Sequence, residues 1–371
     1  MGFYLEKNVK VFGAALDAND DPMKILTKCS YLNRLARGII DINNDFADPY
    51  EALLKYSQVL IKSKFKKIGK LNIESWLRPK PEITDFDKLD PINFQKFTES
   101  GDIINYLNEL EKFIKERILP DIPLMIGVDH SLTGGVIKAL NTLFNPKDTT
   151  IIVFDAHFDG ISAPISLDLA RYAQENKENL NILCSYQLEL MDLEGIEIKD
   201  SYTCASFLAY LIENNIIYPE NLIIIGCQDY PMKEMRLVKD DRVKKYVKKY
   251  LSFEKQGVKF IYAADKNFMI KRLNEILGKL KNNNYYISVD VDVCIFKQVL
   301  AARFMNTIGI EKDLLLELMQ IIQDFIIKTK SKLIGMDFME IETHLLNKEL
   351  KKSGMKDKTI PLIDEILKIF F

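Results

Sequence analysis

Two histidines and four aspartates that could bind metal ions follow three apolar segments of the chain. They are His130, Asp155, His157, Asp159, Asp290 and Asp292. Three of them alternate as Asp-x-His-x-Asp directly after the apolar run 150–154, and alternate residues of an extended chain point the same way. The last two have the same spacing after the run 285–289, and the first follows the run 124–128. The pattern predicts that each set converges on one point.

The number and kind of these ligands discriminate between metals. Four carboxylates and two imidazoles, without a thiolate, exceed the four ligands of one tetrahedral zinc site. They suit a pair of harder divalent ions, and we predict Mn²⁺, two per chain. Two such ions about 3.5–4 Å apart lower the pKa of a water molecule between them, which is chemistry for hydrolysis. A single Asp-x-His-x-Asp run could arise by chance at a strand end, but three segments argue against coincidence.

The elements around these residues alternate between strand and helix. Continuously apolar runs, typical of strands covered on both faces, lie at 9–15, 124–128, 150–154, 222–227, 258–263, 285–289 and 333–338. Helical spacing of apolar residues is found at 104–118, 132–143, 207–212, 268–280 and 312–327. This order predicts an α/β protein with a three-layer αβα fold, in which helices cover both faces of a central, mostly parallel sheet. The ligands should meet at the carboxyl edge of that sheet.

The length of 371 residues allows one large domain, which we expect to span residues 1–371. The stretch from about 41 to 100 departs from the strand–helix rhythm and carries the single tryptophan, Trp76. We interpret it as an elaboration on the domain, either a lid or oligomer contact or a plain structural insertion. Residues 360–371 read as an amphipathic helix that packs against the body or a neighbouring subunit.

Composition and charge exclude several classes of function. A formal net charge of −2 gives no general attraction to nucleic acid, and no apolar run reaches the roughly 18 residues of a membrane span. The lysines near 64–70 and 244–249 are expected on solvated helix faces, with a local docking patch as the alternative. Five cysteines without a Cys-x-x-Cys pair indicate neither a disulfide framework nor a zinc–thiolate site, so we expect a cytoplasmic protein.

The three ligand segments resemble those of the ureohydrolase family, which includes arginase, agmatinase and formiminoglutamase. Residues 127–131 resemble its Gly-Gly-Asp-His-Ser, residues 155–159 its Asp-Ala-His-x-Asp, and residues 288–292 its Ser-x-Asp-x-Asp. All six metal ligands of the family have a counterpart, in the same order, over about residues 120–345. The resemblance implies the arginase-like fold, a binuclear manganese centre and a homo-oligomer.

Weaker matches extend the resemblance to the substrate. Residues 335–341 are similar to the family's Asp-x-x-Glu-Val segment, which implies that Glu340 holds a substrate guanidinium. A carboxylate suits that task because it can accept two N–H groups of a planar cation. Residues 225–229 resemble an arginase segment that contacts the substrate, which makes Asp229 a second candidate anchor; a loop-capping role is the alternative.

Two segments depart from the family. The histidine that the family uses to deliver a proton to the leaving amine has no counterpart in residues 201–207. Either Cys204 or Thr203 takes its place, or another group delivers the proton. His344 is the one imidazole left over, either a catalytic group or an ordinary surface or core residue. The Asp-Pro and loop that usually follow the last ligands are also missing from residues 293–304, so the pocket wall should differ.

The sequence therefore predicts a binuclear manganese hydrolase that cleaves a C–N bond of a guanidino or other amidine group and releases urea from a guanidine. Catalysis is assigned to Asp159, Glu340, Cys204 and His344. The substrate is a small guanidino compound or an arginine within a peptide, as in peptide arginases. The alternative is a noncatalytic metal-binding or regulatory homologue, and a deacylase on a related fold is disfavoured because its site holds one zinc.

Overall fold

The computed structural model describes residues 8–19, 21–39, 46–62, 64–179, 193, 195–304, 309–350 and 354–371. Its centre is an eight-stranded sheet in which every pair of neighbours is parallel, in the order β2-β1-β3-β8-β7-β4-β5-β6. The strands are β1 (Val9–Ala14), β2 (Phe65–Lys70), β3 (Ile122–Gly127), β4 (Thr149–Phe154), β5 (Leu222–Ile225), β6 (Lys259–Ile261), β7 (Asn284–Asp290) and β8 (Lys332–Met339). A short hairpin of β9 (Glu349–Leu350) and β10 (Met355–Lys356) lies outside it.

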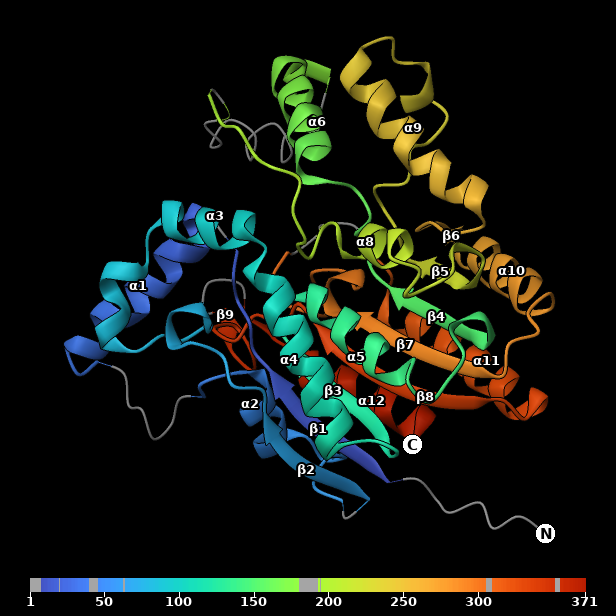
Figure 1. Ribbon diagram of the computed structural model, residues 1–371, viewed down its shortest axis with the longest axis horizontal. Helices are drawn as coiled ribbons and strands as arrows, with labels where there is room; N and C mark the ends of the chain where they lie inside the picture. The colour runs from blue at the N-terminus through green and yellow to red at the C-terminus, as the bar shows by residue number, and fades with distance from the viewer. Residues whose placement is uncertain are drawn as a thin grey trace.

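Helices cover both faces of the sheet because its strands are apolar on both sides. In β4, Ile151 and Val153 join one buried cluster, and Ile152 and Phe154 join the other. The first cluster packs under α1 (Pro22–Ala36), α3 (Pro91–Ser100), α4 (Asp102–Arg117), α5 (Thr133–Leu140), α6 (Ala163–Glu175), α8 (Phe207–Glu213) and α9 (Asp241–Gln256). The second packs under α2 (Pro49–Tyr56), α10 (Lys266–Leu277), α11 (Lys312–Thr329) and α12 (Thr359–Phe370). The predicted three-layer αβα fold is confirmed (Figure 1).

One strand of the central sheet, and the short hairpin of β9 and β10, were missed by the sequence pattern. All seven predicted strands are present, but β2 also joins the sheet by pairing with β1 at its edge. Lys66 and Lys67 of β2 are exposed, so the prediction that the lysines at 64–70 lie on a helix is wrong. Exposed lysines are a common feature of edge strands because they discourage pairing with another chain. The lysines at 244–249 do lie on a helix, α9.

The terminal and inserted segments pack on this body. The predicted tail helix is α12, whose buried Ile363 and Leu367 place it against the second core beside α11. Within the stretch 46–100, the Trp76 ring contacts the rings of Phe94 and Phe97. The interpretation of this stretch as an elaboration on one domain stays a prediction. Among the described residues, no helix combines the length and apolar character needed to cross a membrane.

Four central strands of the sheet, β3, β8, β7 and β4, are neighbours in that order. Because they are parallel, their carboxyl ends open at the same edge. Met125 of β3 lies opposite Asp337 of β8, which in turn lies opposite Ser288 of β7. The segments that follow these strands are thus brought together although they are about 200 residues apart in the chain.

Candidate metal centre

All six predicted metal ligands meet at the carboxyl edge of the central strands. His130 begins a short 3-10 helix that follows β3. Asp290 is the last residue of β7, and Asp292 lies in the 3-10 helix Val291–Val293 after it. The Asp155-x-His-x-Asp segment follows β4 directly.

The ligands form two clusters that share one carboxylate. In the first, Nδ1 of His130 lies 3.2 Å from Oδ2 of Asp155, 3.1 Å from Oδ2 of Asp159 and 3.4 Å from Oδ2 of Asp290. In the second, Nδ1 of His157 lies 3.0 Å from Oδ2 of Asp292 and 3.6 Å from Oδ1 of Asp155. Since Asp155 places one oxygen in each cluster, the two clusters adjoin.

The local geometry differs from the expected extended strand. Asp155 lies beyond the end of β4, and the backbone of Asp159 has a φ of 54°, in the left-handed region. Asp290 and Asp292 do not converge on one point, because the first joins the His130 cluster and the second joins the His157 cluster. The ligands therefore converge through turns after the strands rather than through the alternation of strand residues. A left-handed aspartate costs about 1–3 kcal/mol, and such strain is often found at functional sites.

The donor atoms fit a pair of divalent cations. Nδ1 of His130, Oδ2 of Asp155 and Oδ2 of Asp292 are buried and have no hydrogen-bond partner among the described residues. Burying such groups without partners costs free energy, and burying several carboxylates together costs more. The charge of four carboxylates is balanced by two divalent ions, and oxygen and imidazole donors suit Mn²⁺. The residues present thus satisfy the chemistry expected of a binuclear centre.

A chain of hydroxyl groups orients His130. Its Nε2 lies 2.8 Å from Oγ of Ser288, and that hydroxyl donates to Oδ1 of Asp337 at 2.5 Å. Tyr286 and Thr133 donate to the other oxygen of Asp337. Because the Ser288 hydroxyl donates its proton to Asp337, the Ser288 oxygen can accept a hydrogen bond from Nε2–H of His130. The lone pair of Nδ1 is then free to bind a metal ion.

Sequence reasoning did not assign Asp337 to the site, although it lies within the segment that nominated Glu340. Its signal is a carboxylate inside the apolar run of β8, where it is fully buried. A buried aspartate requires several hydrogen-bond donors, and the three partners in this case come from two other segments, β7 and the start of α5.

We expect Ser288→Ala to weaken metal binding about 10–100-fold, the usual effect of removing a group that orients a histidine ligand. The measurement is a competition titration of Mn²⁺ against a fluorescent chelator. Ser252→Ala is the matched control, because Ser252 donates only to a backbone carbonyl on α9. Unchanged affinity in Ser288→Ala would show that the hydroxyl does not hold the ring.

The metal-free centre should destabilise the protein as the pH rises. Burial alone lowers the pKa of His130, but the nearby carboxylates of Asp155, Asp159 and Asp290 raise it well above its ordinary value. Burial and the charge of Asp155 raise the pKa of Asp159 to about 7. A raised folded-state pKa stabilises the fold below the unfolded pKa, and that contribution is lost as the pH rises through the folded-state value.

We therefore expect the Tm of the metal-free protein to fall as the pH rises from about 5 through neutrality, where Asp159 and then His130 lose their protons. The Tm of the manganese-loaded protein should change less, because bound cations replace the lost protons. Thermal melts between about pH 5 and pH 9, with and without a chelator, measure both curves. A metal-free Tm that rises over this range would contradict the assignment.

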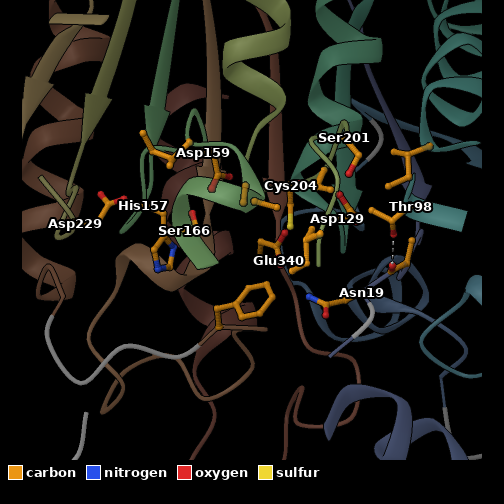
Figure 2. A pocket seen from close by; sticks show the side chains of 18 of the residues that line it. Asn19, Thr98, Asp129, His157, Asp159, Ser166, Ser201, Cys204, Asp229 and Glu340 are labelled. Atoms are coloured by element: carbon orange, nitrogen blue, oxygen red, sulfur yellow. Dashed lines mark hydrogen bonds between the residues drawn. The ribbon is translucent and has the colours of Figure 1, made fainter. Parts of the chain in front are cut away.

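A cavity of about 460 Å³ opens onto the centre. Its lining includes the predicted site residues His157, Asp159, Asp229, Cys204 and Glu340. Figure 2 shows them around one hollow, with Cys204 beside Asp129 and Glu340. Asp290 also reaches the cavity wall. The structure thus brings three of the predicted metal ligands and both predicted substrate residues to one cavity.

Glu340 combines burial, backbone strain and an unused oxygen. It follows β8 with a φ of 57°, and its Oε1 accepts a hydrogen bond of 3.0 Å from the backbone N–H of His130. Its Oε2 is buried and has no hydrogen-bond partner among the described residues. Burial raises the pKa of Glu340 to about 8, and the nearby Arg303 guanidinium opposes that rise. A cation in the cavity would supply the missing partner.

The remaining predicted residues differ in their placement. Asp229 lines the cavity, but its carboxylate also accepts hydrogen bonds from Tyr250 at 3.0 Å and Tyr246 at 3.3 Å. His344 lies elsewhere: its Nε2 is 3.0 Å from the carbonyl oxygen of Pro79, and it is absent from the described lining of this cavity. The structure therefore gives the predicted catalytic role of His344 no support.

The match to a family model shows to which protein family the chain belongs. The model of the arginase family matches residues 60–356, most of the chain and all six ligands. The chain belongs to the arginase family. An arginase from Staphylococcus aureus (strain COL) is 25% identical over 213 residues, which cover 55% of this chain and 59% of that protein. The match thus spans less than two thirds of that relative, so this arginase-family chain is a divergent member.

Solved structures agree with the family assignment at the level of the fold. Proclavaminate amidino hydrolase from Streptomyces clavuligerus aligns with a TM-score of 0.54 at 17% identity, covering 98% of this chain and 92% of that one. Arginase from Bacillus subtilis aligns with a TM-score of 0.53 at 18% identity, covering 98% of both. At these identities the likeness shows the arginase-like fold alone.

Proposed function

We propose that this protein is a metal-dependent hydrolase that cleaves a C–N bond of a guanidino or other amidine group, with urea as coproduct when the substrate is a guanidine. The observation that carries the proposal is the opening of two adjoining ligand clusters and an unpartnered Glu340 oxygen onto one cavity. Membership of the arginase family supports the same reaction class.

The metal centre is proposed to hold two Mn²⁺ ions per chain. His130, Asp155, Asp159 and Asp290 would hold one ion, and Asp155, His157 and Asp292 would hold the other. When bound, such a pair lowers the pKa of a water molecule toward neutrality, polarises the substrate and so supplies the nucleophile for hydrolysis.

The protein's own residues would bind and orient the substrate. Oε2 of Glu340 accepts an N–H of the amidine cation while Oε1 stays on the His130 backbone, which fixes the direction of the carboxylate. The clusters and Glu340 lie on the same cavity, so the amidine carbon is held beside the metal ligands. Asp229 on the cavity wall is a proposed second anchor for the rest of the substrate.

We do not propose Cys204 as the group that gives a proton to the leaving amine. Burial and the charges of Asp129 and Glu340 raise the pKa of its thiol well above the ordinary value, which makes the thiol a poor general acid, because such a group works best with a pKa near the operating pH. We expect Cys204→Ser to change kcat less than about tenfold, whereas a general acid contributes about 10²–10⁴-fold. Steady-state kinetics test this, and a loss in that larger range would instead support the catalytic role predicted from the sequence.

The cavity of about 460 Å³ admits a small guanidino compound, and an arginine side chain of a peptide has the same reactive group. Both substrates are part of the proposal. We also propose a cytoplasmic location, because the described cysteines Cys29, Cys204, Cys227 and Cys294 are free thiols, as expected in a reducing compartment. A homo-oligomer is proposed from the family relationship.

The test is to measure bound metal and then incubate the manganese-loaded protein with guanidino compounds, other amidines and arginine-containing peptides. Urea and free amine are assayed together. Release of either product at a rate that requires the metal supports the hydrolase. No turnover on any amidine would overturn it and favour a noncatalytic metal-binding homologue.

A further inference from the structure

We infer that Arg303 is a positioning residue for the substrate-binding carboxylates. It links them to Asp17 in the N-terminal part of the chain, and the five charged groups of this network carry one net negative charge, which suits a monocationic amidine. The inference rests on the proposed function. Arg303 comes from the segment where the sequence departs from the family pattern after the last ligands.

The guanidinium of Arg303 is buried, with 1% of its side chain exposed. Its Nη2 lies 2.6 Å from Oδ1 of Asp17. Its Nη1 donates to the carbonyl oxygen of Val128 at 3.4 Å, and it lies 3.7 Å from Oδ2 of Asp129 and 3.8 Å from Oε2 of Glu340. One buried cation therefore faces three carboxylates, and two of these line the cavity.

The backbone fixes Arg303 next to Glu340. The N–H of Arg303 donates to the carbonyl oxygen of Glu340 at 2.8 Å, and the N–H of Glu342 donates to that of Ala301 at 2.9 Å. Ala302 and Ile341 form an antiparallel bridge between the same two segments. These bonds hold the Arg303 guanidinium close to the Glu340 carboxylate. Arg303 lies on the side away from the cavity, since it is not part of the cavity lining.

Asp17 connects this arrangement to helix α1. Nζ of Lys28 lies 3.3 Å from Oδ2 of Asp17 and donates to its carbonyl oxygen at 2.7 Å. The same ammonium group lies 4.8 Å from the ring centre of Phe94 in α3. Asp17, Lys28 and Phe94 thus support the charge network from outside the cavity, which gives these residues a role in substrate binding.

When a cation in the cavity favours the ionised form of Glu340, the charges of the network leave one carboxylate without a cation of the protein's own. Asp17, Asp129 and Glu340 are acidic, and Lys28 and Arg303 are basic. Because the contact of Arg303 with Glu340 is longer than a hydrogen bond, Oε2 keeps its capacity to accept an N–H from the substrate. A substrate with one positive charge completes the balance, as buried charges require.

Without Arg303, the carboxylates of Asp129 and Glu340 would repel each other, since their oxygens lie within 4.8 Å. Glu340 would then leave the position in which it faces the amidine. Without the charge of Asp17, the guanidinium would turn fully to Glu340 and compete with the substrate. Both changes should weaken substrate binding and leave the metal ligands in place.

The experiment compares Arg303→Met, Arg303→Lys and Asp17→Asn with the wild type, and uses Arg242→Met, which removes a surface ion pair on α9, as the control. Metal content, KM and kcat are measured, and the binding of butylguanidine is measured by calorimetry. We expect Arg303→Met and Asp17→Asn to raise KM and the Kd of butylguanidine about 30-fold or more. We expect unchanged metal content, a smaller change in kcat, and partial recovery in Arg303→Lys.

Wild-type KM and Kd in Asp17→Asn, or equal losses of metal and binding in the variants, would overturn the inference while leaving the hydrolase proposal intact. Asp17→Asn keeps the shape of the side chain, so it also decides the question if Arg303→Met does not fold. A wild-type protein that binds butylguanidine without hydrolysing any amidine would instead overturn the proposed function, and loss of that binding in the variants would still support the positioning role.

Discussion

Asp155→Ala is expected to remove both metal ions and to lower kcat about 10³-fold or more. Asp155 is the one side chain with an oxygen in each cluster, 3.2 Å from Nδ1 of His130 and 3.6 Å from Nδ1 of His157. Its loss deprives both sites of a ligand, and a bound cation contributes several kcal/mol to hydrolysis, which corresponds to this factor in rate. Metal content by mass spectrometry and initial rates at saturating substrate measure the effect.

Asp168→Ala is the control for this variant. Asp168 forms an ion pair with Lys245 between α6 and α9, outside the cavity lining. It should retain wild-type metal content and kcat, because an exposed ion pair contributes about 0–1 kcal/mol. If Asp155→Ala kept two ions per chain or more than a tenth of wild-type kcat, the shared-ligand assignment would be wrong.

Glu340→Gln is expected to lower kcat/KM about 30-fold to 10³-fold while metal content stays at the wild-type level. A glutamine keeps an oxygen acceptor for the His130 backbone N–H, so the loop should retain its conformation. It removes the negative charge that faces the substrate cation, and loss of one partner of a buried charge pair costs about 2–5 kcal/mol. The measurements are steady-state kinetics and a metal assay on the same samples.

Glu342→Gln provides a matched comparison two residues away. Glu342 pairs with Lys24 at 3.0 Å and is absent from the described cavity lining, so it should leave kcat/KM nearly unchanged. Equal losses in the two variants would mean that the effect comes from the segment as a whole. A Glu340→Gln enzyme with wild-type kcat/KM would show that Glu340 does not bind the substrate cation.

The sequence was sufficient to predict the fold and the six residues that gather at the candidate metal centre, because the relevant signals are local. Each ligand segment directly follows an apolar run, and parallel strands bring their carboxyl ends to one edge. The alternation of side chains along an extended strand nevertheless does not explain why these residues meet. Asp159 reaches His130 through a left-handed turn, and Asp292 joins His157 from a 3-10 helix.

The features that escaped sequence reasoning depend on contacts between distant segments. Asp337 acquires its role from hydroxyl groups of other segments, and Arg303 acquires its role from Asp17, which is 286 positions earlier. The edge strand β2 was hidden by its lysines, since an exposed edge needs no apolar pattern. His344 was nominated by sequence proximity to Glu340, but its ring turns to Pro79.

Titration of Mn²⁺ into the metal-free protein, followed by electron paramagnetic resonance, tests the central claim most directly. We predict about two ions per chain and a spectrum of exchange-coupled manganese, because Asp155 contributes one oxygen to each adjoining cluster. A single ion per chain, or two ions with the spectrum of isolated Mn²⁺, would contradict a binuclear centre at these six residues.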